Sequence, residues 1–103
     1  LHMHSYIVNA TIQVIPLAQD RHPYEWVDIA IEAIVAAGIE HYEVRAFATE
    51  LEGTYDQVTK VYHAVNEQLL NRECPEWITN LQIQVRSKGD MPASEKTEKY
   101  RSD

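Results

Sequence analysis

Several residue types are scarce in this 103-residue chain, and each scarcity excludes a class of protein. Cys74 is the single cysteine, which excludes an internal disulfide and a cysteine zinc site and indicates a reduced, cytoplasmic thiol. The three glycines form neither a P-loop nor a G-x-G-x-x-G motif, and no G-x-S-x-G motif occurs. The sequence therefore has no motif of nucleotide binding or of serine hydrolysis.

Basic residues are few as well, with nine Lys and Arg against sixteen Asp and Glu and a formal net charge of −7. Nucleic-acid binding needs a basic surface, so we expect no such partner, whereas this charge favours a cationic ligand. No apolar run approaches the ~20 residues of a membrane span. No signal peptide is apparent, and we expect a cytoplasmic protein. Leu1 and His2 read as residues added before a native start at Met3, so His2 and His4 are given no role.

Two segments near the ends of the chain alternate apolar with uncharged polar residues. Residues 6–15 read Y-I-V-N-A-T-I-Q-V-I, and residues 78–86 read I-T-N-L-Q-I-Q-V-R. A period of two predicts strands with one apolar face each. The other face, called the amide face below, carries Asn9, Thr11, Gln13, Asn80, Gln82 and Gln84. Such a face suits either a small polar ligand or packing against another subunit.

The residues between these strands predict a helix, a hairpin and a second helix. The first helix is expected over 24–37, after Pro23 and before Gly38, with its apolar stripe formed by Val27, Ile31, Ile34 and Val35. Residues 41–47 alternate as a strand, and a turn near Ala48 leads to a second strand over 49–52, ended by Gly53.

The second helix is expected over 54–71, with Thr54 and Gln57 in a capping box and Pro75 beyond its end. Its apolar stripe is Val58, Val61, Tyr62, Val65 and Leu69. Residues 91–103 have almost no apolar periodicity and read as a polar tail that is mobile or laid on a neighbouring molecule.

The element order is therefore β-α-β-β-α-β, which predicts an α+β ferredoxin-like sandwich. In this fold a four-stranded antiparallel sheet carries both helices on one face. Residues 1–90 are expected to form a single domain, followed by the tail. The fold places the first and last strands side by side, so the amide face is continuous on the side away from the helices. An RNA-recognition domain has the same topology but needs aromatic residues on its central strands, which this chain lacks.

The hairpin over 42–53 is the densest candidate for a site. It brings the rings of Tyr42 and Phe47 together with the carboxylates of Glu43, Glu50 and Glu52. An aromatic ring and a carboxylate together hold a flat cation. The alternative is an ordinary hairpin whose carboxylates face solvent. The histidines at 22, 41 and 63 show no metal-ligand spacing, so no metal site is expected.

Several motifs resemble the small thiamine-binding proteins of the YkoF-like type. They are I-Q-V-I-P-L at 12–17, A-G-I at 37–39, Y-E-V-x-x-F-A-T-x-L-E-G at 42–53 and E-W-I-T-N-L-Q-I-Q-V-R-S-K-G-D at 76–90. The resemblance covers residues 6–90. It implies a ferredoxin-like subunit that assembles through its sheet into a homodimer or homotetramer. It also implies binding of thiamine or hydroxymethylpyrimidine, without catalysis or cofactor, for carriage or salvage of thiamine precursors. Phe47 and Ala48 stand where relatives often have Met and a small residue such as Ser. The hydroxyl donor that a Ser would supply at position 48 is therefore absent.

The resemblance and the residue chemistry together define the expected ligand contacts. Thiamine combines a cationic thiazolium with a flat aminopyrimidine. We expect Thr49 and either Glu43 or Glu52 to bond the pyrimidine, and Phe47 or Tyr42 to stack on the ligand. The predicted ligand-binding residues are Tyr42, Glu43, Phe47, Thr49, Glu52, Asn80 and Gln82.

Two other functions remain open at this point. A small cofactor-free ferredoxin-like enzyme, of the monooxygenase or isomerase type, would use His41 or His63 as its base. A structural or regulatory interaction domain would instead dock through the amide face and bind no small molecule.

Overall fold

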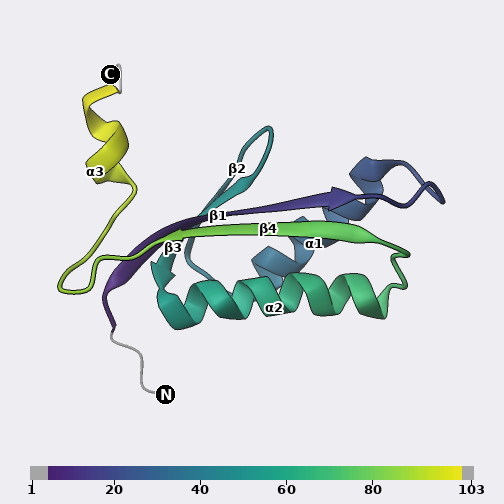
Figure 1. Ribbon diagram of the computed structural model, residues 1–103, viewed down its shortest axis with the longest axis horizontal. Coiled ribbons are helices and arrows are strands. Elements are labelled where there is room, and N and C mark those ends of the chain that lie inside the picture. The colour runs from purple at the N-terminus through teal and green to yellow at the C-terminus, as the bar shows by residue number, and fades with distance from the viewer. Residues whose placement is uncertain (1–4, 101–103) are drawn as a thin grey trace.

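The computed structural model describes residues 5–100 and contains the predicted strands and helices (Figure 1). In chain order these are β1 (Ile7–Pro16), α1 (Pro23–Ala36), β2 (His41–Val44), β3 (Thr49–Thr54), α2 (Tyr55–Asn71) and β4 (Trp77–Gln84). A short helix, α3 (Ser94–Thr97), and a 3-10 turn, Glu98–Tyr100, follow. The expectations about Leu1, His2, Met3 and His4 fall outside the described residues.

The four strands form one antiparallel sheet in the order β2-β3-β1-β4, with α1 and α2 on one side of it (Figure 1). This confirms the ferredoxin-like α+β fold. β1 lies in the middle, paired with both β3 and β4, so the predicted adjacency of the first and last strands is also confirmed. The register places Asn9 between Glu52 and Gln84. Because Val8, Ala10 and Ile12 are buried and alternate with Asn9, Thr11 and Gln13, the amide face lies on the open side of the sheet, away from the helices.

The core lies between the sheet and the two helices. Val8, Ala10 and Ile12 alternate inwards along β1, as the period of two predicted. The stripe predicted for α2 is confirmed, since its four innermost residues have no exposed surface: Val58, Val61, Val65 and Leu69. Full burial of such a side chain contributes about 1.5–3 kcal/mol, so this stripe is a main source of the stability of the fold.

The stripe predicted for α1 was wrong in part. The residues buried on α1 are Trp26, Ile29, Ala30, Ala33 and Ile34, whereas Val35 is exposed. The sequence pattern was misread because alanine contributes little to an apolar pattern. On α1, however, two alanines face the core, where α1 packs against α2 and β1. The larger Val27 and Ile31 lie at the side of the helix, half-buried.

Both helices begin with a capping box. The predicted box on α2 is confirmed: the Gln57 N–H donates to Thr54 Oγ1 (3.2 Å), and the Thr54 N–H donates to Gln57 Oε1 (2.9 Å). The box on α1 was not predicted, because His22 supplies the capping atom. The Tyr24 N–H donates to His22 Nδ1 at 3.1 Å, and the His22 N–H donates to Glu25 Oε2. His22 thus has a structural role.

All four strand ends differ from the prediction, that of β1 by a single residue, at Pro16. β2 stops at Val44, and residues 45–48 form a turn closed by the Arg45 N–H donating to the Ala48 carbonyl (3.0 Å). β3 does not end at Gly53 but continues to Thr54, and β4 ends at Gln84 rather than at residue 86. The alternation of apolar and polar residues carries no information about where the neighbouring strand stops. It therefore does not fix the last paired residue of a strand.

Gly38 ends α1 with a backbone φ of +82°, and a Cβ built there would meet nothing within 4 Å. Gly38→Ala is therefore expected to lower the free energy of unfolding by about 1–2 kcal/mol through backbone strain alone. Chemical denaturation measures the effect. The matched control is Gly89→Ala, whose Cβ would make an ordinary 3.7 Å contact with Arg86 Cδ. Equal stabilities of the two variants would contradict the strain argument.

Residues 91–100 fold back onto the chain's own sheet, an arrangement that the sequence analysis did not consider. Met91 is only 2% exposed, and its N–H donates to the Ile7 carbonyl at 2.8 Å. Asn9 Nδ2 donates to the Met91 carbonyl at 2.9 Å. The tail rises from the sheet where β1 begins and β4 ends (Figure 1). These contacts are mostly polar and include a single buried side chain, so no periodic pattern in the sequence predicts them.

Charged side chains hold the tail at two further points. Arg86 donates two hydrogen bonds to the Glu95 carboxylate, at 2.6 and 3.1 Å, and this bonding lowers the pKa of Glu95 below its ordinary value. Lys96 Nζ donates to Asn9 Oδ1 (2.8 Å) and to Gln84 Oε1 (2.7 Å). The tail thereby engages one end of the amide face and leaves the rest of it open.

Candidate ligand-binding site

The sheet separates Thr49 from the carboxylates predicted to act with it. Along β3, Thr49 is buried towards the helices, whereas Glu50 and Glu52 alternate onto the open face. Glu43 lies opposite Glu50 in the strand pairing and so shares that face. Thr49 and the carboxylates of Glu43 and Glu52 therefore lie on opposite faces of the sheet in one chain, and their shared contact with a pyrimidine ring stays a prediction. The ligand-binding roles of the individual residues remain predictions.

A hollow of about 190 Å³ lies where the turn over 45–48 meets α1 and β1; we call it the hairpin hollow. Its lining is mainly apolar, and Thr49 contributes a hydroxyl group. The other lining residues used in the argument below are Ile12, Tyr24, Val27, Ile31, Ile34, Val44 and Phe47. The half-buried residues of α1 that do not face the core thus line this hollow.

The Thr49 side chain is 5% exposed, yet its hydroxyl makes no hydrogen bond with any described residue. Within residues 5–100, no fully enclosed side-chain nitrogen or oxygen lacks a partner, so the hydroxyl of Thr49, which lines the hairpin hollow, is not sealed from solvent. A ligand atom that displaces solvent and donates to or accepts from Thr49 would gain about 0.5–1.5 kcal/mol, the net contribution of a typical hydrogen bond.

Two aromatic rings stand at the rim of the hairpin hollow. Phe47 is 85% exposed on the turn between β2 and β3, and Tyr24 is 74% exposed in the first turn of α1. Exposed rings beside an apolar hollow suit a flat or cationic ligand, which they contact face-on. Sequence analysis missed Tyr24, because the side of α1 that faces the hollow could not be read from its apolar pattern.

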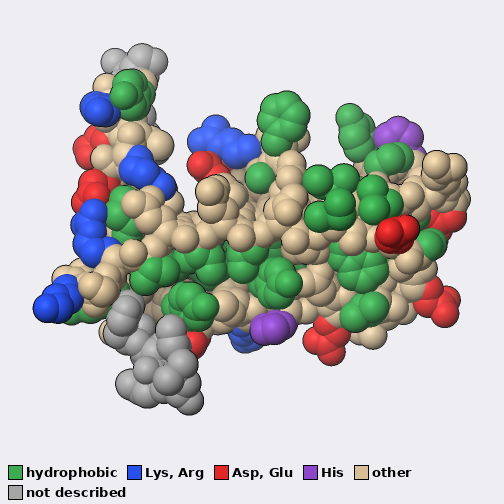
Figure 2. Space-filling model, in the orientation of Figure 1, with side chains coloured by type: hydrophobic (Ala, Val, Ile, Leu, Met, Phe, Trp, Pro, Cys, Tyr) green, Lys and Arg blue, Asp and Glu red, His purple; other side chains and the backbone are tan. Residues whose placement is uncertain are grey.

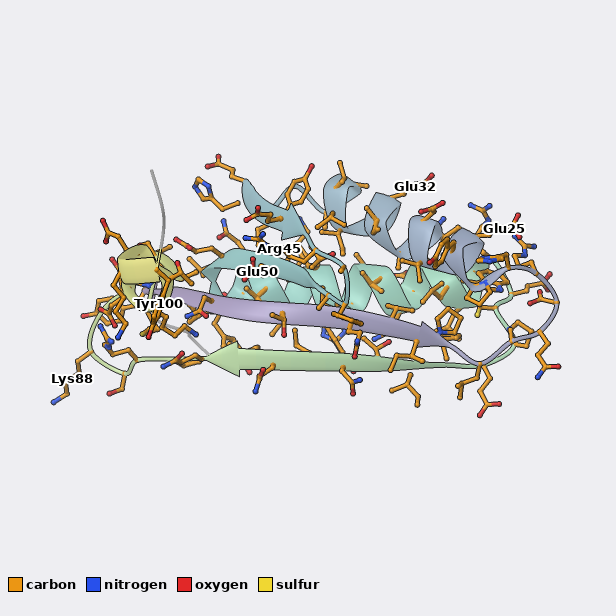
Figure 3. All side chains as sticks on the ribbon, turned by 90° about the horizontal axis from the view of Figure 1, so that it is seen from above. Glu25, Glu32, Arg45, Glu50, Lys88 and Tyr100 are labelled. Carbon is orange, nitrogen blue, oxygen red and sulfur yellow. The ribbon has the colours of Figure 1, made fainter. Side chains whose placement is uncertain are left out.

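Tyr42, Glu43 and Glu52 line a different hollow, of about 500 Å³, on the open face, where Tyr100 of the tail closes one side. Three of its carboxylates, those of Glu43, Glu50 and Glu52, already have partners. Arg45 contacts Glu43 at 3.1 Å and Glu50 at 3.0 Å, and Figure 3 shows Arg45 beside Glu50. The hydrogen bond with Glu50, with the charges of both carboxylates, raises the pKa of Arg45 above its ordinary value.

The Glu52 carboxylate accepts a hydrogen bond from the Ala93 N–H at 3.2 Å, which ties it to the tail. Asn80 and Gln82 lie exposed on β4, away from both hollows, and Asn80 Nδ2 donates to Gln13 Oε1 at 3.2 Å. The predicted ligand-binding residues thus occupy three places, and two of them, Phe47 and Thr49, share the hairpin hollow.

The remaining candidates for chemistry have other surroundings. His41 and His63 are both exposed, and His63 packs edge-on against Tyr62. No group of His, Cys, Asp or Glu within residues 5–100 has the geometry of a metal site. Cys74 is buried, and burial raises the pKa of its thiol. No helix in the described part of the chain is long and apolar enough to cross a membrane.

Comparison with known proteins assigns the chain to a family. The pattern of the thiamine-binding protein family matches residues 10–101, so the chain belongs to that family. This confirms the resemblance to YkoF-like proteins drawn from the sequence motifs. The match begins at residue 10 and continues past residue 90 into the tail, to residue 101.

Relatives of known sequence or structure agree with this assignment. A UPF0045 protein of Clostridium perfringens is 30% identical over 93 residues, which cover 90% of this chain and 96% of the relative. A DUF77 domain of unknown function from Bacillus cereus has 32% identity and a TM-score of 0.87, with 98% and 96% coverage of the two chains. A Thermotoga maritima protein, named provisionally for thiamine biosynthesis or salvage, has 28% identity and a TM-score of 0.77, with 92% and 99% coverage.

Proposed function

We propose that this protein binds thiamine or its hydroxymethylpyrimidine part in the hairpin hollow, without catalysing a reaction. The observation that carries this proposal is the hydroxyl of the buried Thr49, unpaired among residues 5–100, in a mainly apolar hollow. The family and the name of the Thermotoga maritima relative support the choice of ligand. A cytoplasmic role in carrying or salvaging thiamine precursors follows as part of the same proposal.

The size of the hairpin hollow decides which part of thiamine enters it. Sites that enclose a drug-sized ligand measure about 300–1,000 Å³. At about 190 Å³ the hairpin hollow accepts a single ring. The flat, uncharged aminopyrimidine fits the apolar walls, and one of its nitrogen groups bonds the Thr49 hydroxyl, which both donates and accepts. The thiazolium then stays outside, at the rim.

The rim offers what a cationic ring needs. Phe47 and Tyr24 present exposed faces that attract a cation, an interaction worth about 0.5–1 kcal/mol at exposed sites. The net charge of −7 adds a general attraction for a positive ligand. Glu43 and Glu52 are not required at this site, because they bond Arg45 and the tail on the other face of the sheet.

We further propose that subunits assemble through the open face of the sheet, as a homodimer or homotetramer. Beyond the tail this face presents uncharged amides and, at its far end, the neighbouring Ile15 and Ile78, which are both exposed. Sheets commonly cover such a face by packing against a second sheet. Support for this arrangement comes from the composition of the face.

Titration calorimetry with thiamine and, separately, with hydroxymethylpyrimidine tests the ligand proposal. The wild-type protein is expected to bind both, near one ligand per chain. Thr49→Val keeps the shape of the side chain and removes the hydroxyl, so both affinities should fall about tenfold or more. The fold should be unaffected, because the hydroxyl has no partner among residues 5–100.

Two further variants locate the ligand. Thr11→Val makes the same chemical change on the open face and should leave both affinities unchanged. Phe47→Ala should weaken thiamine and leave hydroxymethylpyrimidine unchanged, since only thiamine carries the cation. An unaltered affinity of Thr49→Val for both ligands would remove the hairpin hollow from consideration. Failure of the wild-type protein to bind either ligand at sub-millimolar concentration would overturn the proposed function.

A further inference from the structure

A single charged residue lines the hairpin hollow. Among the described residues around it, Arg45 carries the only charge, and the others are apolar or uncharged. Arg45 also lines the second hollow, on the open face, together with Glu40, Glu43, Glu50 and Glu52. Arg45 therefore borders both the hairpin hollow and a group of carboxylates. Whether its charge is free or balanced bears on how the hairpin hollow receives an anion.

Two of these carboxylates balance the charge of Arg45. Its Nε donates to Glu50 Oε2 at 3.0 Å, and its Nη2 donates to Glu43 Oε2 at 3.1 Å. Nε and Nη2 form one edge of the guanidinium, the kind of edge that binds a phosphate through two parallel hydrogen bonds. In this protein carboxylates occupy that edge. Within the three groups, one positive charge faces two negative charges.

The first turn of α1, which borders the hairpin hollow through Tyr24, already uses two of its donors. A helix N-terminus commonly binds phosphate through N–H groups of this kind. Here the Tyr24 N–H donates to His22 Nδ1 at 3.1 Å, and the Glu25 N–H donates to the His22 carbonyl at 3.0 Å. The capping box also places the Glu25 carboxylate at this end of the helix, where it adds a negative charge. Arg21, just before the box, faces the carboxylate of Asp20 at 3.9 Å.

The other basic side chains of residues 5–100 do not line the hairpin hollow. Figure 2 shows those on the visible face mainly along the tail, and it shows acidic side chains next to the basic group beside the β2–β3 hairpin. On the tail, Lys96 bonds Asn9 and Gln84. Arg86 likewise bonds Glu95. An anion at the hairpin hollow would therefore meet surroundings in which negative charge prevails.

We propose that the hairpin hollow selects the unphosphorylated alcohols, thiamine and hydroxymethylpyrimidine, over their phosphate esters, and that Glu43 and Glu50 set this preference. The inference rests on the function proposed above and specifies the class of ligand within it. A phosphate monoester carries about −1.5 to −2 charges at pH 7. It would lie at the rim, since the hollow of about 190 Å³ holds a single ring. There Arg45 offers it a charge that two carboxylates already outweigh.

This preference places the protein at one point in a reaction sequence. A protein that holds the free alcohols receives them from import or from hydrolysis of a phosphate ester. It delivers them to a phosphotransferase, which joins the alcohol oxygen to the terminal phosphoryl group of a nucleoside triphosphate and releases the diphosphate and a proton. The ester formed in that step would bind the hairpin hollow only weakly, so the protein would retain the substrate of the phosphotransferase and not its product.

Titration calorimetry with thiamine and with thiamine monophosphate, at low ionic strength, tests the preference. The wild-type protein is expected to bind the monophosphate about tenfold or more weakly than thiamine. Added salt should narrow this ratio, because Arg45 and its two carboxylates are exposed. Equal affinities, or tighter binding of the monophosphate, would overturn this inference and leave the proposed function standing. Binding of neither compound would overturn the proposed function and this inference with it.

Charge variants identify the residues responsible. The double variant Glu43→Gln with Glu50→Gln keeps the shape of both side chains and leaves the charge of Arg45 unbalanced, so the preference for thiamine should fall to about threefold or less. Adding Arg45→Gln to this variant should weaken binding of the monophosphate again. The matched control, Glu32→Gln with Glu67→Gln, removes two charges beside the groove between α1 and α2 and should leave the ratio unchanged. An unchanged ratio in the first variant, or an equal change in the control, would contradict the assignment to Glu43 and Glu50.

Discussion

Trp26→Ala is expected to lower the free energy of unfolding by about 3–5 kcal/mol, a large part of the total for a domain of this size. Trp26 is 1% exposed and packs in the core between α1 and the sheet. Its Nε1 donates to Asp20 Oδ1 at 3.1 Å, and the Arg21 guanidinium lies 4.3 Å from the centre of its ring. The substitution would leave a cavity and release the segment before α1.

Urea denaturation followed by circular dichroism measures this loss. The matched control is Tyr24→Ala, which removes an exposed aromatic ring two residues earlier on the same helix. That change is expected to alter the stability by no more than about 0.5 kcal/mol. If the two variants proved equally stable, Trp26 would not belong to the core as described.

Met91→Ala is expected to release the tail from the sheet. Truncation of a buried methionine costs about 2–5 kcal/mol, and no other side chain of residues 91–100 is buried. Because this loss is confined to one segment, we expect local opening before global unfolding. The Met91 amide, which donates to Ile7, should exchange with solvent at least about tenfold faster.

Hydrogen exchange by mass spectrometry resolves this effect by segment. Tyr100→Ala serves as the control, since Tyr100 lies on the same tail and is largely exposed. It should leave the exchange of the Met91 amide unchanged. Slow exchange at Met91 in the Met91→Ala variant would mean that the bonds of Arg86 and Lys96 suffice to hold the tail.

The sheet and α2 could be predicted because each has a strong periodic signal. Val8, Ala10 and Ile12 alternate with polar residues, and the stripe from Val58 to Leu69 repeats at helical spacing. Such patterns reflect burial of one face, which is the main force that positions these elements. The inward side of α1 was harder to predict, since Ala30 and Ala33 give a weak apolar signal although both pack against the core.

The arrangement of the candidate site residues could be predicted only in part. Phe47 and Thr49 of the hairpin over 42–53 line one hollow, and their role in ligand binding stays a prediction. Glu43 and Glu52 come from the same segment but lie on the other face, because successive residues of a strand point to opposite sides. Tyr24 lies on α1, far from the hairpin in the sequence. Local spacing therefore does not reveal that it lines the same hollow.

The tail could not be predicted at all from periodicity. Its position depends on one buried side chain, Met91, and on hydrogen bonds to residues about eighty positions earlier, such as Ile7 and Asn9. Interactions of this kind leave no repeating pattern in the sequence. The charged side chains of the tail suggested a solvated segment. Instead, Lys96 donates hydrogen bonds to Asn9 and Gln84, and Glu95 accepts one from Arg86.

The central position of β1 also has a consequence for how the chain acquires its structure. β1 obtains its two neighbours from residues 49–54 and 77–84, and Ile7 gains its last backbone bond from Met91. The strand partners of β1 are therefore made well after it, and residues 37 (Ile12 and Thr49) to 75 (Asn9 and Gln84) positions apart must come together. Chains with such non-local pairing fold more slowly than helical bundles of the same length. A ribosome-bound chain that has not yet released β4 would hold β1 with one side unpaired, in need of protection from other nascent strands.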